Sequence, residues 1–183
     1  MNSFTHLRLI KQTKRAFFYA FYCKGEIYSE LGAFMREYKD NDEFEYIPAI
    51  IRHLHRHVIG ESSLDKVDFF RPEGELVAIP GKENNENIVE GIDVGLRVFC
   101  YKPNNKTLVY LNGYHHDGIM GDYRRHPNFA HKSPRIMQAV HALILGEKMG
   151  YVHLDPNGGY YEDRRFQKLI TRKEEFDLTE YLK

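Results

Sequence analysis

One stretch of the sequence determines the architecture expected for this chain: Leu96-Arg97-Val98-Phe99-Cys100-Tyr101-Lys102-Pro103-Asn104-Asn105-Lys106-Thr107-Leu108-Val109-Tyr110-Leu111-Asn112-Gly113-Tyr114. Two runs of β-branched, aromatic and other apolar residues flank the segment 103–106, whose Pro-Asn-Asn-Lys sequence is typical of a turn. The stretch therefore predicts a β-hairpin with strands over 96–101 and 107–114. Because side chains alternate between the two faces of a strand, Arg97 is expected opposite Val98, pointing away from the core.

The sequence upstream of the hairpin predicts two strands and two helices. Residues 17–23 are short, aromatic and followed by Lys-Gly, which is typical of a strand. Apolar residues at helical spacing predict amphipathic helices over about 26–39 and 43–59. Residues 76–79 predict a short strand, and the polar run 82–87 is typical of an exposed loop.

Downstream of the hairpin, a polar loop over 115–133 precedes a helix that runs to about 148. Ser133 is its expected N-cap, and Pro134 suits its first turn. Residues 151–154 and 160–161 predict a second hairpin, and 162–183 a docking helix or arm. The expected fold class is α+β: a small antiparallel sheet with an N-terminal helical pair and a further helix packed on it. This core spans 1–149, and a C-terminal extension, 150–183, packs on it.

Composition narrows the functional classes. The 183 residues carry 26 Lys+Arg and 26 Asp+Glu, which excludes a uniformly basic coat for nucleic acid but allows a local basic patch. With Cys23 and Cys100 as the only cysteines, neither a disulfide framework nor a cysteine-based zinc knuckle is expected. No apolar run approaches the roughly 18 residues of a membrane span, and the start lacks a signal-peptide pattern. We expect a cytoplasmic protein without a membrane partner, and without a cofactor, since no glycine-rich nucleotide motif occurs.

The order of these elements and three motifs resemble the RelE/HigB superfamily of toxin–antitoxin ribonucleases. The motifs are Leu-Arg-Val-Phe-x-Tyr at 96–101, Leu-Val-Tyr-Leu-x-Gly-Tyr at 108–114, and Lys-Ser-Pro at 132–134 before a helix. The resemblance covers about 17–149 and is strongest over 95–140. This chain departs from the family pattern in having His115-His116 in place of two lysines and an insertion over 117–130. The segment 150–183 has no counterpart.

The resemblance implies a bacterial or phage endoribonuclease toxin, an mRNA interferase, that cleaves RNA without a metal. Its partners would be RNA, on or off the ribosome, and a cognate antitoxin. Arg97 lies on the strand that carries a family arginine, so it would stabilise the phosphate. His115 or His116 would transfer protons, and only one of them can face a site on the sheet, since neighbours on a strand point to opposite faces. Lys132 and Arg135 would bind the RNA backbone.

The residues themselves are compatible with this chemistry. Metal-independent RNA cleavage needs a base for the 2′-hydroxyl, a cation for the phosphorane and an acid for the leaving 5′-oxygen. Histidine, which ordinarily titrates near pH 6.5, supplies base or acid, and an arginine fork matches phosphate oxygens. Tyr101 offers a ring on which a base can stack. The densest basic cluster near the end of the hairpin contains Arg124, Arg125, Lys132 and Arg135.

Two other functions remain open. A non-catalytic relative of the same fold would bind protein, as an inhibitor, an immunity protein or a phage modulator; the neutral charge and the missing lysine pair favour it.

An HD-type metal phosphohydrolase would use His116-Asp117 with ligands drawn from His126, His131, Asp122 or His53. Such enzymes are all-α, whereas this doublet follows a predicted hairpin. His53 and His57 stand one helical turn apart, but their position beside an apolar stripe is typical of a half-buried helix edge.

Overall fold

The computed structural model describes residues 4–23, 26–60, 64, 70–80, 95–116, 123–150, 152–155, 158–162 and 170–171. Seven strands form the main sheet: β1 (Phe4–Gln12), β2 (Phe17–Cys23), β3 (Arg71–Glu73), β4 (Leu76–Ile79), β5 (Leu96–Asn104), β6 (Thr107–His115) and β9 (Ile170–Thr171). The described residues also form the α-helices α1 (Glu30–Tyr38), α2 (Tyr46–Gly60) and α4 (Ser133–Lys148) and the short 3₁₀ helix η2 (Tyr123–Arg125). A separate ribbon consists of β7 (Val152–Leu154) and β8 (Tyr160–Glu162).

The main sheet is mixed, with strand order β3-β4-β5-β6-β2-β1-β9. Its neighbours are antiparallel except for β2 beside β6 and β1 beside β9, which are parallel. The prediction of a purely antiparallel sheet is therefore wrong. After β2 the chain leaves the sheet through α1 and α2, re-enters at the far edge as β3, and returns through three antiparallel pairings to β6, which lies parallel to β2. The edge strand β3 carries Pro72, which discourages further pairing.

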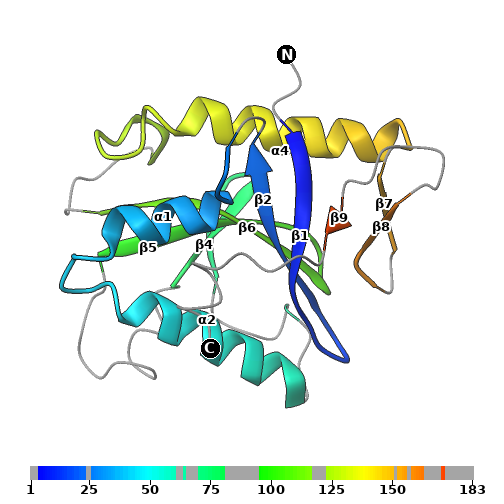
Figure 1. Cartoon of the computed structure of the whole chain (residues 1–183), viewed down its shortest axis with the longest axis horizontal. Coiled ribbons are helices and arrows are strands. Elements are labelled where there is room, and N and C mark those ends of the chain that lie inside the picture. The colour runs from blue at the N-terminus through cyan, green and yellow to red at the C-terminus, as the bar shows by residue number, and fades with distance from the viewer. Residues whose placement is uncertain are drawn as a thin grey trace.

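Helices cover both faces of the sheet (Figure 1). On one face, Phe18, Val98 and Tyr110 pack with the apolar sides of α1 and α2. On the other, Phe99 and Val109 join Phe129 and the apolar side of α4. The aromatic run of β2 serves both cores, because alternate residues bury themselves on opposite faces.

This double coverage corrects the expectation for Arg97. The strand alternates as predicted, with Val98 toward α1 and α2 and Phe99 toward α4. The face that Arg97 shares with Phe99 is a second core, however, and Arg97 is only 8% exposed. Arg97 therefore lies inside the protein, where its Nη1 donates a hydrogen bond to the carbonyl oxygen of Leu96 at 3.1 Å.

The hairpin, the strands at 17–23 and 76–79 and the three helices are confirmed, with helix starts shifted by a few residues. The second hairpin is confirmed as β7 and β8, and Val152 and Tyr160 bury themselves in the α4 core. The predicted loop 82–87 lies outside the described residues, as does most of 162–183. Within that last stretch, Ile170–Thr171 pairs with Leu7 and Arg8 of β1. No helix in the described part of the chain is long and apolar enough to cross a membrane.

The prediction that Ser133 caps α4 is wrong. The helix begins at Ser133 itself, preceded by Lys132, and no side chain caps it. The N–H groups of Lys132 and Ser133 already donate to the carbonyl of Phe129, at 2.8 and 2.9 Å. The chain thus enters α4 from a preceding turn, and these backbone donors have no need of a capping hydroxyl.

Candidate functional site

A β-bulge in the hairpin decides which side chains meet at its end. Val98 lies opposite Gly113 and Cys100 opposite Tyr110, so two residues of β6 face the single residue Phe99. The extra residue shifts the alternation along the rest of β6. Tyr114 consequently lies in the α4 core, its ring stacked on Phe99 at 5.7 Å between centroids.

Four side chains gather on this face beyond the bulge, and we refer to them as the histidine cluster: Arg97, Tyr114, His116 and His126. The His116 and His126 rings are stacked with centroids 5.8 Å apart. The Tyr114 ring lies beside both, with centroids 6.2 Å from His116 and 4.6 Å from His126. Arg97 is the cross-strand partner of Tyr114. The fold thus places two of the three predicted catalytic residues, Arg97 and His116, on the same face of the sheet at this end of the hairpin.

His126 is held in one orientation by the turn that follows η2. Its Nδ1 accepts the backbone N–H of Asn128 at 3.2 Å, and its carbonyl accepts the N–H groups of Phe129 and Ala130. The side chain is buried, with 4% exposure. Because Nδ1 acts as an acceptor, the neutral ring carries its proton on Nε2. Sequence reasoning considered His126 only as a metal ligand, since nothing local indicates that a loop residue ten positions on reaches His116.

His115 lies on the opposite face, as the alternation requires. Its Nε2 is 3.6 Å from Oε2 of Glu43, in the segment between α1 and α2. The same Glu43 oxygen accepts the N–H groups of Gly95 and Leu96, at 2.7 and 3.1 Å. Glu43 therefore fixes both the start of β5 and the imidazole of His115. The predicted catalytic pair His115 and His116 is thus divided between the two faces of the sheet.

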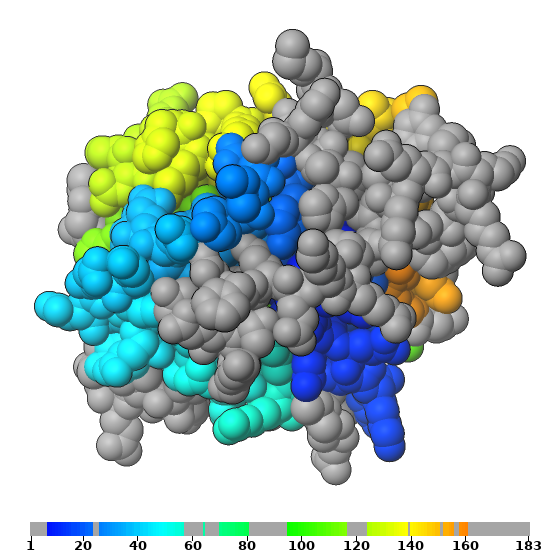
Figure 2. Space-filling model, in the orientation of Figure 1, coloured from blue at the N-terminus to red at the C-terminus, as the bar shows by residue number. Residues whose placement is uncertain are grey.

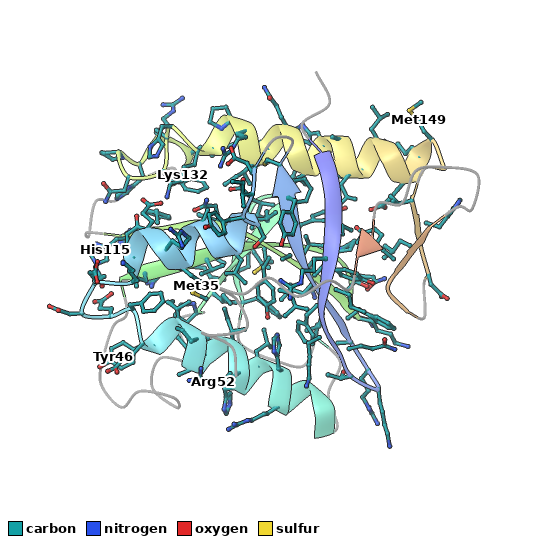
Figure 3. The ribbon with its side chains drawn as sticks, viewed as in Figure 1. Met35, Tyr46, Arg52, His115, Lys132 and Met149 are labelled. Atoms are coloured by element: carbon teal, nitrogen blue, oxygen red, sulfur yellow. The ribbon has the colours of Figure 1, made fainter. Side chains whose placement is uncertain are left out.

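Lys132 is directed into the protein, toward the edge of β6 that faces β2. The pairing of β2 with β6 extends only as far as Tyr110, so the second half of β6 lacks a strand partner on this edge. Lys132 Nζ donates to the carbonyl of Gly113 at 3.2 Å, to Asn112 Oδ1 at 3.4 Å and to Glu37. It is 7% exposed, and Figure 3 shows it between α4 and α1.

Other side chains complete the same edge. The N–H of Gly113 donates to Asn112 Oδ1 at 2.8 Å, and that of His115 to the Tyr38 hydroxyl at 3.2 Å. The carbonyl of His115 accepts Nδ2 of Asn128 at 3.0 Å. Buried backbone groups need such partners, so Lys132 and its neighbours substitute for a missing strand. This gives Lys132 a structural role, and its use as an RNA ligand would take its hydrogen bond away from the carbonyl of Gly113.

Arg135 is likewise engaged by acids at the start of α1. It bonds Glu26 and Glu30, each at 2.9 Å. Glu30 is 2% exposed and also accepts Nδ2 of Asn112 at 2.9 Å. Burial together with Glu30 raises the pKa of the neighbouring Cys23 thiol, so the thiol stays protonated. By contrast, Arg124 and Arg125 are exposed on η2, directly before His126.

Tyr101 lies apart from the histidine cluster. It sits on the α4 face of β5 beside Glu147, which belongs to the last turns of α4. Burial, with the charges of Glu147 and Glu75, raises its pKa to about 12. The ring is half-buried and remains a phenol at physiological pH. The place where Tyr101 could stack on a base is therefore remote from His116 and His126.

Only some of the metal ligands expected for an HD-type hydrolase belong to the part of the chain that the structure describes. In the described part of the chain, no group of three or more His, Cys, Asp and Glu side chains is arranged to hold a metal ion. Asp117 and Asp122 lie outside the described residues.

No family model, curated protein or solved structure matches the chain.

Proposed function

We propose that this chain is an endoribonuclease, a divergent relative of the RelE/HigB toxins, in which His116 transfers the protons and His126 stabilises the transition state with a hydrogen bond. The observation that carries the proposal is the stacked pair of imidazoles, 5.8 Å apart and on one face, with the Tyr114 ring beside both. Exposed Arg124 and Arg125 stand on the adjoining turn, where RNA phosphates would lie. The observed order of two strands, two helices, four antiparallel strands and a helix includes the element order on which the resemblance rests, and this supports the relationship.

The two histidines receive different roles. The base must present an unprotonated nitrogen to the ribose 2′-hydroxyl, and we assign this to His116. The freed 2′-oxygen attacks phosphorus, the bond to the 5′-oxygen breaks, and His116 returns the proton it has taken up to the leaving 5′-oxygen. His126, whose Nδ1 accepts the N–H of Asn128, keeps its proton on Nε2 and donates a hydrogen bond to the phosphorane. Arg97 supplies positive charge from within the sheet, and a cognate antitoxin would cover this end.

Substitution of the two histidines tests the proposal. His116→Ala removes the base, and His126→Asn removes Nε2 while an amide oxygen can still accept the Asn128 N–H. Each is expected to lower the cleavage rate of single-stranded RNA about 100-fold or more, the usual contribution of a general base or of a hydrogen-bond donor to the transition state. Induced expression in bacteria should arrest growth and degrade RNA with wild type only.

The matched control is His141→Ala, which removes an exposed histidine of α4 that bonds Glu75. It should cleave at the wild-type rate. If His116→Ala and His126→Asn fold normally and cleave as fast as His141→Ala, the assignment is wrong. Arg97→Ala is a poorer test than the sequence suggests, because it would leave a cavity in the α4 core.

A second function is favoured by the engagement of Lys132 and Arg135 with Glu37, Glu30 and Glu26. These pairings remove two of the expected RNA-binding cations, and a non-catalytic relative that binds protein would need none of them. Intact RNA together with a stable stoichiometric protein complex would favour this function over cleavage.

A further inference from the structure

The zero net charge of the chain conceals a strong separation of charge. The segment 26–45, which forms α1 and the approach to α2, contains seven acidic residues: Glu26, Glu30, Glu37, Asp40, Asp42, Glu43 and Glu45. The other end of α2 is basic. We define the basic end as the set of Lys11, Lys14, Arg15, Arg52, Arg56 and Lys106. The described segments that carry these residues, 11–16, 50–56 and 104–107, contain no Asp or Glu.

Three segments that are distant in sequence meet to form the basic end. The N–H of Phe17 donates to the carbonyl of Lys106 at 2.8 Å, which joins the β1–β2 turn to the β5–β6 turn. Lys11 is paired with Phe18, whose ring packs on His55 of α2 at 4.4 Å between centroids. The charge of Lys11 also acts on His55, which places β1 beside the second half of α2.

These cations point outward. Lys11, Lys14, Arg15 and Arg56 are exposed, and Arg52 and Lys106 are half-buried. Arg52 and Arg56 are one turn apart on the same side of α2, and Figure 3 shows Arg52 directed away from the sheet. The β1–β2 turn projects from the lower right of Figure 2. His115 and Tyr46 stand at the opposite end of the molecule in Figure 3, so the basic end is remote from the histidine cluster.

We propose that the basic end binds the phosphate backbone of single-stranded nucleic acid. The side chains exposed there in 11–16 and 52–56 are lysine, arginine, glutamine and histidine. Protein interfaces have apolar or aromatic centres and are depleted in lysine, whereas nucleic-acid interfaces are polar and strongly positive. Since no exposed aromatic residue lies in these segments, binding is through phosphates and is insensitive to base sequence. The surface is separate from the proposed catalytic site, and binding does not require cleavage.

The test measures the binding of a fluorescent 16-nucleotide single-stranded DNA, which cannot be cleaved through a 2′-hydroxyl, over a range of salt concentrations. The variant Lys11→Gln/Lys14→Gln/Arg56→Gln removes three charges from the basic end. The control Arg36→Gln/Lys39→Gln/Lys148→Gln removes three exposed charges elsewhere, so both proteins have the same net charge. Thermal melting establishes that both variants fold.

We expect the basic-end variant to bind at least tenfold more weakly and its slope of log K against log salt to fall by about 2, at roughly 0.7 per lost phosphate contact. The control variant should bind like wild type. Equal binding by the two variants overturns the proposal, as does absence of binding by wild type at low salt. Competition by polyglutamate as effective as by DNA of equal charge would indicate an acidic protein partner and also overturns it. His116→Ala should bind normally, so failure of the catalytic proposal leaves this result unchanged.

Discussion

His55 is buried between α2 and the sheet, where its Nε2 lies 3.0 Å from the hydroxyl of Tyr110. Burial lowers the pKa of His55 from its ordinary value of 6.5 to about 3, and the charge of Lys11 adds to the shift. Burial also raises the pKa of Tyr110 well above its ordinary range. The two groups therefore share a hydrogen bond between neutral partners inside the core.

His55 should make the folded protein sensitive to acid. Its folded-state pKa is below that of the unfolded chain, so the unfolded state takes up a proton first as the pH falls. The stabilising contribution is complete above pH 6.5 and is lost at up to about 1.4 kcal/mol per pH unit as the pH falls toward 3. Urea unfolding of wild type and His55→Gln at several pH values measures the difference, because glutamine can bond Tyr110 but does not titrate. Parallel pH dependence of the two proteins would show that folded His55 takes up the proton normally.

A substitution at Lys132 tests whether this residue is a structural cation or an RNA ligand. Lys132→Met keeps the apolar stem but removes the donor shared by Gly113, Asn112 and Glu37. We expect the free energy of unfolding to fall by about 3 kcal/mol, as for other buried charges that lose one partner. Arg124→Met, at an exposed position, should change it by less than about 0.5 kcal/mol. Unchanged stability of Lys132→Met combined with weaker RNA binding would restore the role expected from sequence.

Among the larger elements, α1 and α4 lie on opposite faces of the sheet yet bond to each other through the gap between β2 and β6. Lys132 and Arg135 reach across that gap to Glu37, Glu30 and Glu26. Figure 2 shows the two helices side by side at the surface, α1 in blue and α4 in yellow. Gly113 lies directly after the bulge in β6, and its lack of a side chain lets Phe34 of α1 pack closely on this strand.

Two glycines give a matched prediction about packing. A Cβ on Gly113 would lie 2.0 Å from the Arg97 carbonyl oxygen and 2.8 Å from the Phe34 ring. Gly113→Ala should therefore lower the free energy of unfolding by about 3 kcal/mol or more, at the upper end of overpacking. A Cβ on Gly146, inside α4, would lie 3.7 Å from Val152. Gly146→Ala should stabilise by about 0.5–1 kcal/mol, the ordinary gain of alanine over glycine in a helix. Denaturant unfolding measures both, and a tolerated Gly113→Ala would contradict the described bulge.

The local elements could be predicted from sequence, but their arrangement could not. The hairpin and the three helices follow from periodicities of two and 3.6 residues and from turn residues. β1 was missed, because Thr, His, Arg and Lys interrupt its apolar residues. The burial of Arg97 was missed because alternation shows which face a residue occupies and not what covers that face. The meeting of His116 with His126 depends on both the bulge and the turn after η2, and neither has a sequence signature.

Considered as a whole, the molecule has an acidic end at α1, a basic end at the β1–β2 turn, and the histidine cluster at the end of β6. The net charge reports none of this, which is why composition excluded a uniform coat but allowed a local basic patch. The patch expected from sequence near Lys132 is partly neutralised within the fold, and the strongest concentration of exposed cations in the described chain lies elsewhere. Cleavage and nucleic-acid binding are thereby assigned to different ends.

The proposed chemistry is tested most directly by the ends of the cleaved RNA. Purified protein is incubated with a single-stranded RNA and with its all-deoxy counterpart, and the products are identified by mass spectrometry. Attack by the 2′-oxygen predicts cleavage of the RNA alone, giving a 2′,3′-cyclic phosphate and a 5′-hydroxyl, with both products absent for His116→Ala. Uncut RNA with folded wild-type protein, or products ending in a 3′-hydroxyl and a 5′-phosphate, would contradict the histidine mechanism.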